Sequence, residues 1–209
     1  MTTPQQNDSS YGMGKTGNGI KRTFDFCVAV GCCIFFSPLI LICYILIKLE
    51  DGGPAIFKQE RIGRHGKPFY IYKFRSMDVD AEKDGPSLFQ HENDLRLTKV
   101  GKVLRSHHLD ELPQLWNVVK GDMAFIGPRP ERKFYIDQIM EQDPRYELLY
   151  ALRPGVTSYA TLHNGYTDTM EKMLIRLKMD LYYLEHQSLW MDIKILWKTF
   201  TNIVSGKIF

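Results

Sequence analysis

The chain has 209 residues, which is enough for one domain with a sizeable core and not obviously for two. Its 27 Lys and Arg residues against 24 Asp and Glu residues give a net charge of +3, a bias too weak to indicate nucleic acid as a partner. All four cysteines lie within one apolar segment, which argues against a disulfide framework that staples loops and suits small apolar fillers in a membrane helix: Cys27, Cys32, Cys33 and Cys43.

The N-terminal part of the chain divides into a polar tail and an apolar segment. Residues 1–19 are rich in Gly, Ser, Thr, Asn and Gln, a composition that predicts a flexible tail. Residues 20–50 contain an uncharged run from Phe26 to Ile47. As one helix this run would be about 33 Å long and would cross a bilayer core of roughly 30 Å. Ser37 and Pro38 interrupt it, and an interior proline bends a helix.

Basic residues flank both ends of the apolar segment. Lys21 and Arg22 precede it, and Lys48 and Lys58 follow it, so the positive-inside tendency favours both ends on the cytoplasmic side. A helix that enters one leaflet, breaks and returns fits both the charges and the proline. We therefore predict a re-entrant membrane helix followed by a cytosolic domain over residues 51–209. An ordinary single-pass anchor is the alternative, because prolines also occur in spanning helices.

Two stretches after the apolar segment have strand character. Residues 55–61 and 68–75 are joined by a turn that contains two glycines, which predicts a β-hairpin. Lys73 and Arg75 share one face of the second strand and are candidates for binding phosphate, although a solvated face explains them equally well. The acidic and polar residues 78–94 are predicted to form a surface loop.

Two adjacent carboxylates, Asp110 and Glu111, stand at a predicted helix start. Asp is a good N-cap residue, and Pro113 is tolerated in a first turn because its missing N–H would be unpaired there. Consecutive helical residues point in different directions, so one carboxylate can address a substrate atom while the other holds a metal or a proton. The alternative is that Asp110 only caps the helix and Glu111 is only a first-turn acid.

The surroundings of this acidic pair are amphipathic. Residues 95–105 mix apolar and basic side chains, so this segment lies either in the membrane interface or on the core. His107 and His108 are either exposed or tune the carboxylates, and without a third partner they do not indicate a zinc site. A stripe at helical spacing is expected to bury one side of the helix: Leu109, Leu112, Leu115 and Trp116.

A short rigid element follows at Pro128, Arg129 and Pro130. Each proline fixes its own φ and pushes the preceding residue away from the helical region, so Arg129 should be extended with little freedom to lose. The planar fork of a guanidinium suits a diphosphate. A rigid turn with an exposed arginine is the alternative.

The C-terminal third shows helical periodicity. Apolar residues recur at helical spacing over residues 170–184 and 193–204, and Gly206 suits the end of the second helix. Trp190 and Trp197 place this second helix either at the membrane interface or against the soluble core.

Several long motifs surround the acidic pair, and they read Asp110-Glu111-Leu112-Pro113-Gln114-Leu115-Trp116-Asn117-Val118, Lys120-Gly121-Asp122-Met123 and Gly127-Pro128-Arg129-Pro130. Shorter ones are Lys73-Phe74-Arg75-Ser76-Met77 and Arg153-Pro154-Gly155-Val156-Thr157. From about Lys21 to its C-terminus the chain resembles the bacterial sugar transferase family, the monotopic phosphoglycosyl transferases. It departs from the family pattern at residues 158–166, where a commonly shown Gln and Arg have no clear counterparts.

The resemblance implies a mainly helical α+β fold. A re-entrant membrane helix, broken at Ser37-Pro38, would join a single compact cytosolic domain with a small β-hairpin and interfacial helices. The implied location is the bacterial cytoplasmic membrane, with the catalytic domain on the cytosolic face. The implied reaction moves a sugar 1-phosphate from a UDP-sugar to undecaprenyl phosphate and releases UMP. This step would begin a surface glycan, such as an exopolysaccharide or capsule, that downstream glycosyltransferases extend.

The resemblance also implies roles for single residues. Asp110 would be the nucleophile of a covalent aspartyl intermediate, and Glu111 together with Asp110 would hold Mg²⁺. The implied substrate-binding residues are all basic: Arg105, Arg129, Lys73, Arg75 and Arg153. One rival hypothesis is an enzyme in which the acidic pair activates water without a covalent step. Another is a single-pass anchored protein that binds anionic lipid or recruits partners without catalysis.

Overall fold

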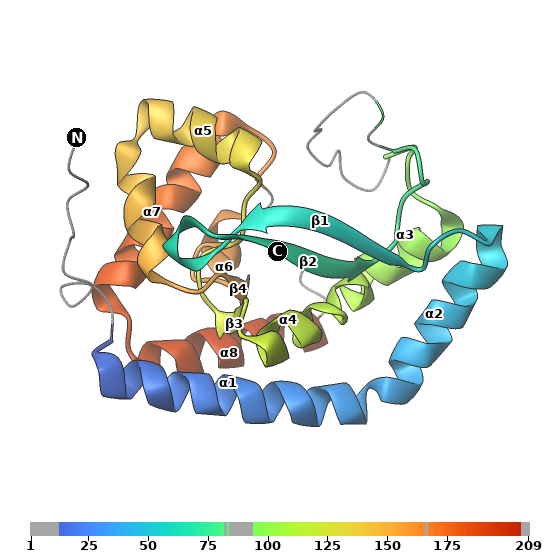
Figure 1. Ribbon diagram of the computed structural model, residues 1–209, viewed down its shortest axis with the longest axis horizontal. Helices are drawn as coiled ribbons and strands as arrows, with labels where there is room; N and C mark the ends of the chain where they lie inside the picture. The colour runs from blue at the N-terminus through green and yellow to red at the C-terminus, as the bar shows by residue number, and fades with distance from the viewer. Residues whose placement is uncertain (1–12, 82, 84–93, 166, 206–209) are drawn as a thin grey trace.

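The computed structural model describes residues 13–81, 83, 94–165 and 167–205. Helices dominate this part of the chain, and two small two-stranded sheets lie among them (Figure 1). The predicted mainly helical α+β fold with a small hairpin is therefore confirmed. Parts of the predicted tail and of the loop over 78–94, as well as Tyr166 and Gly206, lie outside the described residues.

The apolar segment forms two helices, α1 (Lys15–Phe35) and α2 (Ser37–Asp51), which meet at a 60° bend. The break lies where Ser37 and Pro38 predict it, and the Ser37 hydroxyl donates to Ile34 O at 2.8 Å. Among the described residues no single helix is long and apolar enough to cross a membrane, whereas the bent pair satisfies length and composition together.

Helix α1 begins earlier than predicted, so the assignment of residues 15–19 to a flexible tail is wrong. Tertiary contacts explain this start. Met13 N donates to Gln187 Oε1 at 3.1 Å, and Asn18 Nδ2 donates to Met13 O at 2.6 Å. These bonds tie the beginning of α1 to the end of α7 (Met170–His186).

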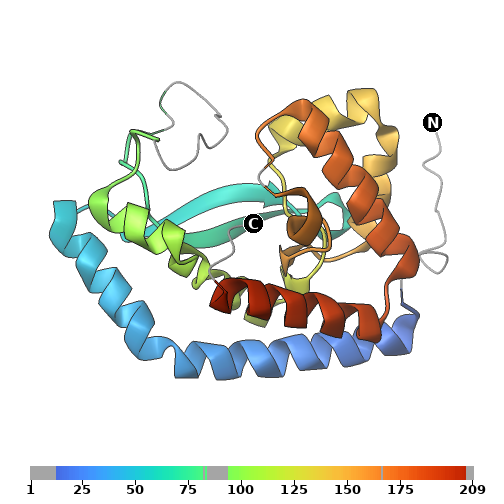
Figure 2. The same ribbon diagram turned by 180° about the vertical axis from the view of Figure 1, so that it is seen from behind.

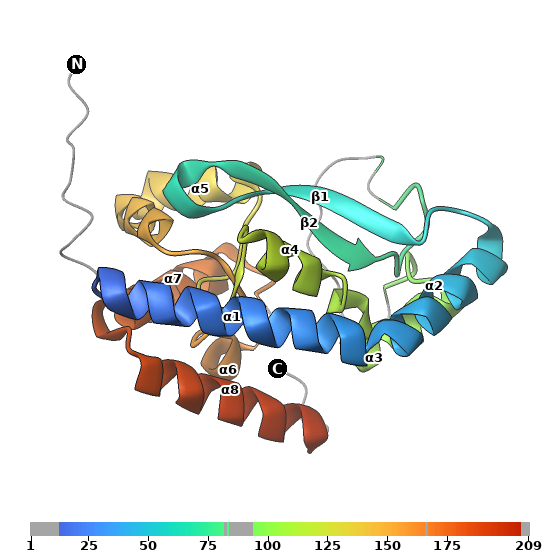
Figure 3. The ribbon, with the colours of Figure 1, turned by 60° about the horizontal axis from the view of Figure 1, so that its bottom comes forward.

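Buried polar contacts attach α1 to the rest of the domain. Lys21 Nζ lies 2.7 Å from Asp192 Oδ2 and 3.9 Å from Asp25, and the Tyr183 hydroxyl donates to Asp192 Oδ1 at 2.6 Å. The Arg22 guanidinium donates to two backbone carbonyls near the C-terminal end of α4 (Gln114–Lys120). Lys21 and Arg22 therefore anchor α1 along the base of the domain (Figures 1 and 3).

The predicted hairpin is present as β1 (Ile56–Ile62) and β2 (Pro68–Phe74), joined through the 3-10 turn η1 (Arg64–Gly66). The buried Asn117 side chain pairs with the free edge of β2: its Oδ1 accepts from Tyr72 N at 3.0 Å, and its Nδ2 donates to Tyr70 O at 2.7 Å. This amide takes the place of a neighbouring strand and fixes α4 against the hairpin.

A second sheet, which the sequence did not predict, pairs β3 (Ala124–Ile126) in parallel with β4 (Gly155–Thr157). The helices α5 (Lys133–Gln142), η4 (Pro144–Ala151) and α7 pack beside it. The largest described core forms here, and its members include Ile126, Ile136, Ile139, Leu149, Leu177, Tyr183 and Leu184.

The two predicted C-terminal helices are confirmed as α7 and α8 (Leu189–Val204); the short α6 (Thr161–Asn164) precedes them. Helix α8 lies beside α1 (Figures 2 and 3). Large apolar side chains are exposed along α8: Leu189, Trp190, Ile193, Trp197, Phe200 and Ile203. Others are exposed on the helices of the bent pair, among them Ile20, Phe24, Phe35, Leu41, Ile45 and Leu49.

Candidate active site

The acidic pair lies in a 3-10 turn, η3 (Leu109–Glu111), between α3 (Lys99–Ser106) and α4. Asp110 is therefore not the N-cap of a long helix, and that prediction is wrong. Because Pro113 has no N–H, it cannot bond to Leu109 O, and the tighter bond from Leu112 N to Leu109 O at 3.2 Å forms instead. His108 precedes the turn in the left-handed region, with φ of 54°.

The predicted apolar stripe is buried only in part. Leu115 is buried, and Leu109 and Leu112 pack against the core under α2 and α3. Trp116 remains 56% exposed, so its predicted burial is wrong. The 3-10 turn changes the spacing before α4, and the four side chains no longer share one helical face.

Basic groups reach both carboxylates of the pair. Lys73 Nζ on β2 lies 2.6 Å from Glu111 Oε1, and Arg105 Nε at the end of α3 lies 4.0 Å from Asp110 Oδ2. Asp110 is only 4% exposed. The structure thus brings Lys73 to Glu111 across 38 residues of sequence and places Arg105 beside Asp110.

The pKa values of the two carboxyl groups are shifted in opposite directions. Burial raises the pKa of Asp110, the charge of Lys73 opposes this rise, and the neighbouring charge of Glu111 adds to it. Burial alone would also raise the pKa of Glu111, but the charges of Lys73 and Arg129 and the hydrogen bond from Lys73 lower it to about 2. Glu111 is therefore held in its ionised form near neutral pH, whereas Asp110 is the more basic carboxylate.

Arg129 lies on the exposed surface between two buried prolines, Pro128 and Pro130. Its charge lowers the pKa of Glu111, which places its guanidinium within electrostatic reach of the acidic pair. The charge of His108 likewise lowers the pKa of both acids. His107 is exposed, and its Nδ1 lies 3.0 Å from both Val103 O and Ser106 Oγ.

Arg75 does not join this site. Its guanidinium forms a two-pronged ion pair with Asp51 at the end of α2, with Nη1 to Oδ2 at 2.6 Å, and its Nε donates to Pro54 O at 2.8 Å. The prediction that Arg75 faces substrate phosphate is therefore not supported, because its donors hold the chain between α2 and β1.

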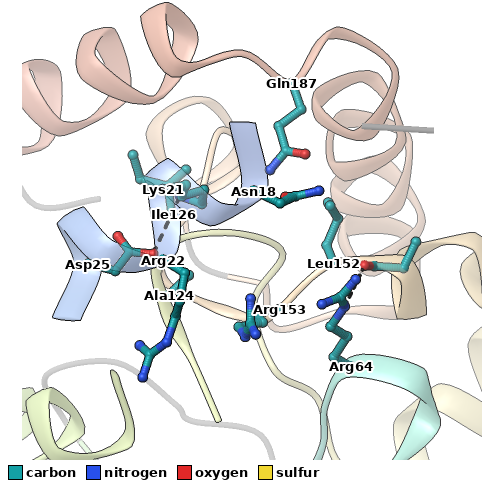
Figure 4. A pocket seen from close by; sticks show the side chains of 11 residues that line it. Asn18, Lys21, Arg22, Asp25, Arg64, Ala124, Ile126, Leu152, Arg153 and Gln187 are labelled. Carbon is teal, nitrogen blue, oxygen red and sulfur yellow. Dashed lines mark hydrogen bonds and ion pairs between the residues drawn. The ribbon is translucent and has the colours of Figure 1, made fainter. Parts of the chain in front are cut away.

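Arg153 also lies elsewhere. Its Nε donates to Gly121 O at 3.1 Å, and its side chain lines a cavity against α1 together with Arg22 and Arg64 (Figure 4). Burial lowers the pKa of Arg153, and the charges of Arg64 and Arg22 add to the effect. Arg153 therefore supports the end of α4 and is not grouped with the acidic pair.

The donor set suits one kind of metal. Within the described part of the chain, no group of three or more His, Cys, Asp or Glu side chains is arranged to hold a metal ion. Mg²⁺, however, commonly uses one or two carboxylates and completes its shell with water and substrate phosphate oxygens. Asp110 and Glu111 fit that pattern, since they are adjacent and Glu111 stays ionised.

Sequence reasoning missed a second charged cluster, beneath the segment that carries Arg129. Glu131 pairs with Arg176 at 2.5 Å and with Arg61 at 3.6 Å. Nearby, burial raises the pKa of Asp180 to about 7, and the charge of Glu131 adds to this rise. One signal was available: Arg176 and Asp180 interrupt the apolar stripe of α7, where unpaired charge would be unfavourable.

Comparison with known proteins gives consistent matches. A sequence model described as bacterial sugar transferase matches residues 16–206. A UDP-N-acetylgalactosamine-undecaprenyl-phosphate N-acetylgalactosaminephosphotransferase of Aeromonas hydrophila is 43% identical over 187 residues, which cover 90% of this chain and 44% of that protein. A UDP-glucose:undecaprenyl-phosphate glucose-1-phosphate transferase of Klebsiella pneumoniae is 42% identical over 188 residues, covering 87% of this chain and 40% of that protein.

A third relative is closer in length. A UDP-glucose:undecaprenyl-phosphate glucose-1-phosphate transferase of Caulobacter vibrioides is 40% identical over 188 residues, covering 88% of this chain and 70% of that protein. The chain thus spans less than half the length of the first two relatives and most of the third.

Proposed function

The chain belongs to the bacterial sugar transferase family, and from this premise we propose that it transfers a sugar 1-phosphate from a UDP-sugar to undecaprenyl phosphate. The observation that carries the proposal is the acidic pair. Asp110 is buried beside Glu111, Lys73 and Arg105 lie within 4.0 Å of the two carboxylates, and the charge of Arg129 lowers the pKa of Glu111. Relatives named for this reaction with two different sugars support the reaction class and leave the sugar to experiment.

The proposed chemistry has two displacements. In the first, an Asp110 carboxylate oxygen forms a bond to the β-phosphorus of the UDP-sugar, and the bond from that phosphorus to the bridging oxygen breaks, so UMP leaves with the electron pair. In the second, a phosphate oxygen of the lipid attacks the same phosphorus. The acyl–phosphate bond then breaks, which regenerates the Asp110 carboxylate and leaves a lipid diphosphate sugar.

The surrounding residues address the main obstacle, which is charge repulsion. An anionic carboxylate must approach a diphosphate, and in a site with little water this repulsion is strong. Arg105 lies beside Asp110, and the planar fork of Arg129 suits two phosphate oxygens. Mg²⁺ held by Glu111 and Asp110 would supply further positive charge at the diphosphate.

Lys73 has a role of its own in this arrangement. Its ammonium lies 2.6 Å from Glu111, so it offsets the charge of that carboxylate. A cation of the flexible Lys type can leave this pair and follow the phosphate as it binds. Lys73 therefore competes with metal for Glu111 and contributes charge to the substrate.

The fold also suits a substrate confined to a bilayer. We propose that α1 and α2 form the re-entrant membrane helix and that α8 lies in the interface, because their exposed apolar side chains would otherwise face water. The catalytic domain would face the cytosol at the bacterial cytoplasmic membrane, where UDP-sugars are soluble. The lipid-linked product would then begin a surface glycan that downstream glycosyltransferases extend.

The test is UMP release by protein purified in nanodiscs. UDP-N-acetylgalactosamine, UDP-glucose and other UDP-sugars would each be supplied with Mg²⁺, with and without undecaprenyl phosphate. Lipid-dependent UMP release with one sugar is the expected result and identifies the donor. Folded protein that releases no UMP with any sugar would contradict the proposal.

A second measurement separates the covalent route from its rival. With a donor that carries label in its β-phosphate and without lipid, labelled sugar phosphate should remain on the protein and leave when undecaprenyl phosphate is added. Turnover in which the label never stays on the protein would instead favour direct activation of the acceptor by the acidic pair.

Labelling of introduced cysteines on both sides of vesicles would test the topology, since a single-pass anchor places the two ends on opposite sides.

A further inference from the structure

The backbone around Arg129 is held from both sides. On one side, Gly155 N of β4 donates to Pro128 O at 2.9 Å. On the other, Arg61 Nη1 at the end of β1 donates to Pro130 O at 3.1 Å. Only the side chain of Arg129, which is exposed, extends from between these two attachments.

The flank toward β4 is closed by close packing. A Cβ on Gly127 would overlap Arg153 O, and a Cβ on Gly155 would overlap Gly127 N. The segment before Arg129 therefore lies against β4 at a separation that only glycine permits. It cannot shift in that direction, so any remaining freedom of Arg129 depends on the other flank.

The other flank is held by a buried ionic cluster that we call the Glu131 clamp, which consists of Arg61, Glu131 and Arg176. Glu131 is 6% exposed and lies 2.5 Å from Arg176 Nη2 and 3.6 Å from Arg61 Nη1. Its backbone carbonyl also accepts from Ile62 N at 3.0 Å. Residues of strand β1 and helix α7 thus hold Glu131, two positions after Arg129.

Arg61 connects the clamp to the Arg129 backbone directly. The same Nη1 atom contacts both Pro130 O and the Glu131 carboxylate, so the position of the ion pair and the position of the backbone are coupled. The charge of Arg129 contributes to the lowered pKa of Glu111 and to that of Glu131. Arg129 therefore acts electrostatically on both the acidic pair and the clamp.

Stability alone does not explain such a cluster. A buried ion pair generally contributes little more than apolar residues of the same volume, because both charges lose their hydration. What it does provide is a fixed direction, since charged hydrogen bonds tolerate little displacement. Transfer to a phosphorus atom is sensitive to displacements of about 1 Å in the groups that hold the substrate.

We propose that the Glu131 clamp is a positioning unit for Arg129 and sets the place at which the guanidinium binds the diphosphate of the sugar nucleotide. This inference rests on the proposed function, because it takes the nucleotide as the ligand of Arg129. Glu131, Arg61 and Arg176 do not touch the substrate themselves. They act through the Pro128–Glu131 backbone.

The test is a double-mutant cycle between Glu131→Gln and Arg129→Ala, measured in nanodiscs with the best donor sugar. Each single variant should raise KM for the UDP-sugar or weaken UDP binding roughly 10- to 100-fold. The double variant should bind no more weakly than Arg129→Ala alone, because the clamp then has nothing left to position. If Glu131 had only a structural role, Glu131→Gln would weaken UDP binding by the same factor, and lower Tm by the same amount, with and without Arg129→Ala.

Controls make the result specific. Asp137→Asn removes an exposed carboxylate that pairs with Lys133 at 2.7 Å on the neighbouring helix α5, and it should leave KM unchanged. If Glu131→Gln does not fold, Arg61→Lys enters the cycle instead, since it keeps the charge and removes the Nη1 atom that contacts both Pro130 O and Glu131. Wild-type KM in either clamp variant, or additive losses, would overturn the proposal.

Failure of the clamp and failure of the proposed function give different results. If the wild-type protein transfers no sugar phosphate, equilibrium binding of UDP to the same four proteins still measures the coupling to Arg129. If the wild-type protein binds UDP and the cycle is additive, only the clamp is wrong. If it binds no UDP at all, both proposals fall.

Discussion

Two acidic pairs in the part of the chain that the structure describes share an electrostatic pattern and differ in exposure. In the first, Glu111 is held ionised by cations while burial raises the pKa of Asp110. In the second, Glu131 is held ionised by Arg176 and Arg61 although burial opposes it, while burial raises the pKa of Asp180 to about 7. In the first pair the Glu111 side chain is 23% exposed, whereas in the second both acids are buried, with Glu131 6% and Asp180 3% exposed.

This difference shows that a perturbed pKa does not by itself mark a catalytic group. Desolvation and like charge act in the same way at both places. What separates them is the exposure of the ionised acid and of one cation. The Glu111 side chain is 23% exposed and Arg129 is exposed, whereas the Glu131 side chain is 8% exposed and Arg176 is buried. The first pair can therefore exchange partners with a ligand, whereas the second can act only through the residues that it holds in place.

Replacing the acid with the raised pKa in each pair should give the largest contrast between an effect on turnover and an effect on stability. Asp110→Asn removes the proposed nucleophile and should lower turnover by at least about 10⁴-fold, while Tm and membrane association stay near their wild-type values. Lipid-dependent UMP release, measured beside membrane flotation, checks this. Substantial activity in the variant would exclude Asp110 as the nucleophile.

In the enclosed pair, Asp180→Asn should change stability rather than chemistry. An acid whose pKa is raised in the folded state stabilises the fold while it is protonated, and that stability is lost as pH rises from the unfolded value of 3.8 to about 7. The loss amounts to about 4 kcal/mol at most. Asp180 Oδ1 has no hydrogen-bond partner, which agrees with a carboxyl group that is poorly prepared to ionise.

The measurement is Tm in detergent at pH 5 and pH 8 for the wild-type and variant proteins. The wild type should lose more stability than Asp180→Asn between these values, so the difference between the two proteins should grow in favour of the variant at pH 8. Parallel curves would show that Asp180 does not titrate in this range.

Activity should follow the opposite direction, since Asp110 must be ionised and turnover should fall as pH drops through its raised pKa.

Local patterns in the sequence predicted part of this arrangement. The hairpin and the helices α7 and α8 follow from alternation and helical spacing, and the 60° bend follows from Pro38. The motif around Asp110 identified the acidic pair, because its two members are neighbours in sequence. In each case the information lies within a window of a few residues.

The remaining features depend on partners that are far apart in the chain. The strands β3 and β4 have three residues each, too few for a periodic pattern, and they pair across about thirty residues. Glu131 and Arg176 are 45 residues apart. The helix start predicted at Asp110 failed for a local reason, since Pro113 removes the bond that an α-helical turn would need.

A smaller effect is expected from the cation of the accessible pair. Lys73→Met removes the group that neutralises Glu111, so turnover should fall about 100-fold because substrate charge is less well balanced. Half-saturation by Mg²⁺ should nevertheless occur at a lower concentration, because the metal no longer competes with an ammonium at 2.6 Å. Titration of UMP release against Mg²⁺ checks both, and an unchanged Mg²⁺ dependence would show that Lys73 and metal do not share Glu111.

The smallest effect concerns Arg75, which stands two residues after Lys73 and was predicted to bind substrate with it. In the structure its guanidinium is committed to Asp51 and Pro54 O, so Arg75→Lys should leave KM and turnover within about twofold of wild type. Tm should fall, because an ammonium cannot reproduce the two-pronged pair that fastens the end of α2. A KM effect as large as that of Lys73→Met, without loss of Tm, would mean that Arg75 leaves Asp51 and joins the accessible pair when substrate binds.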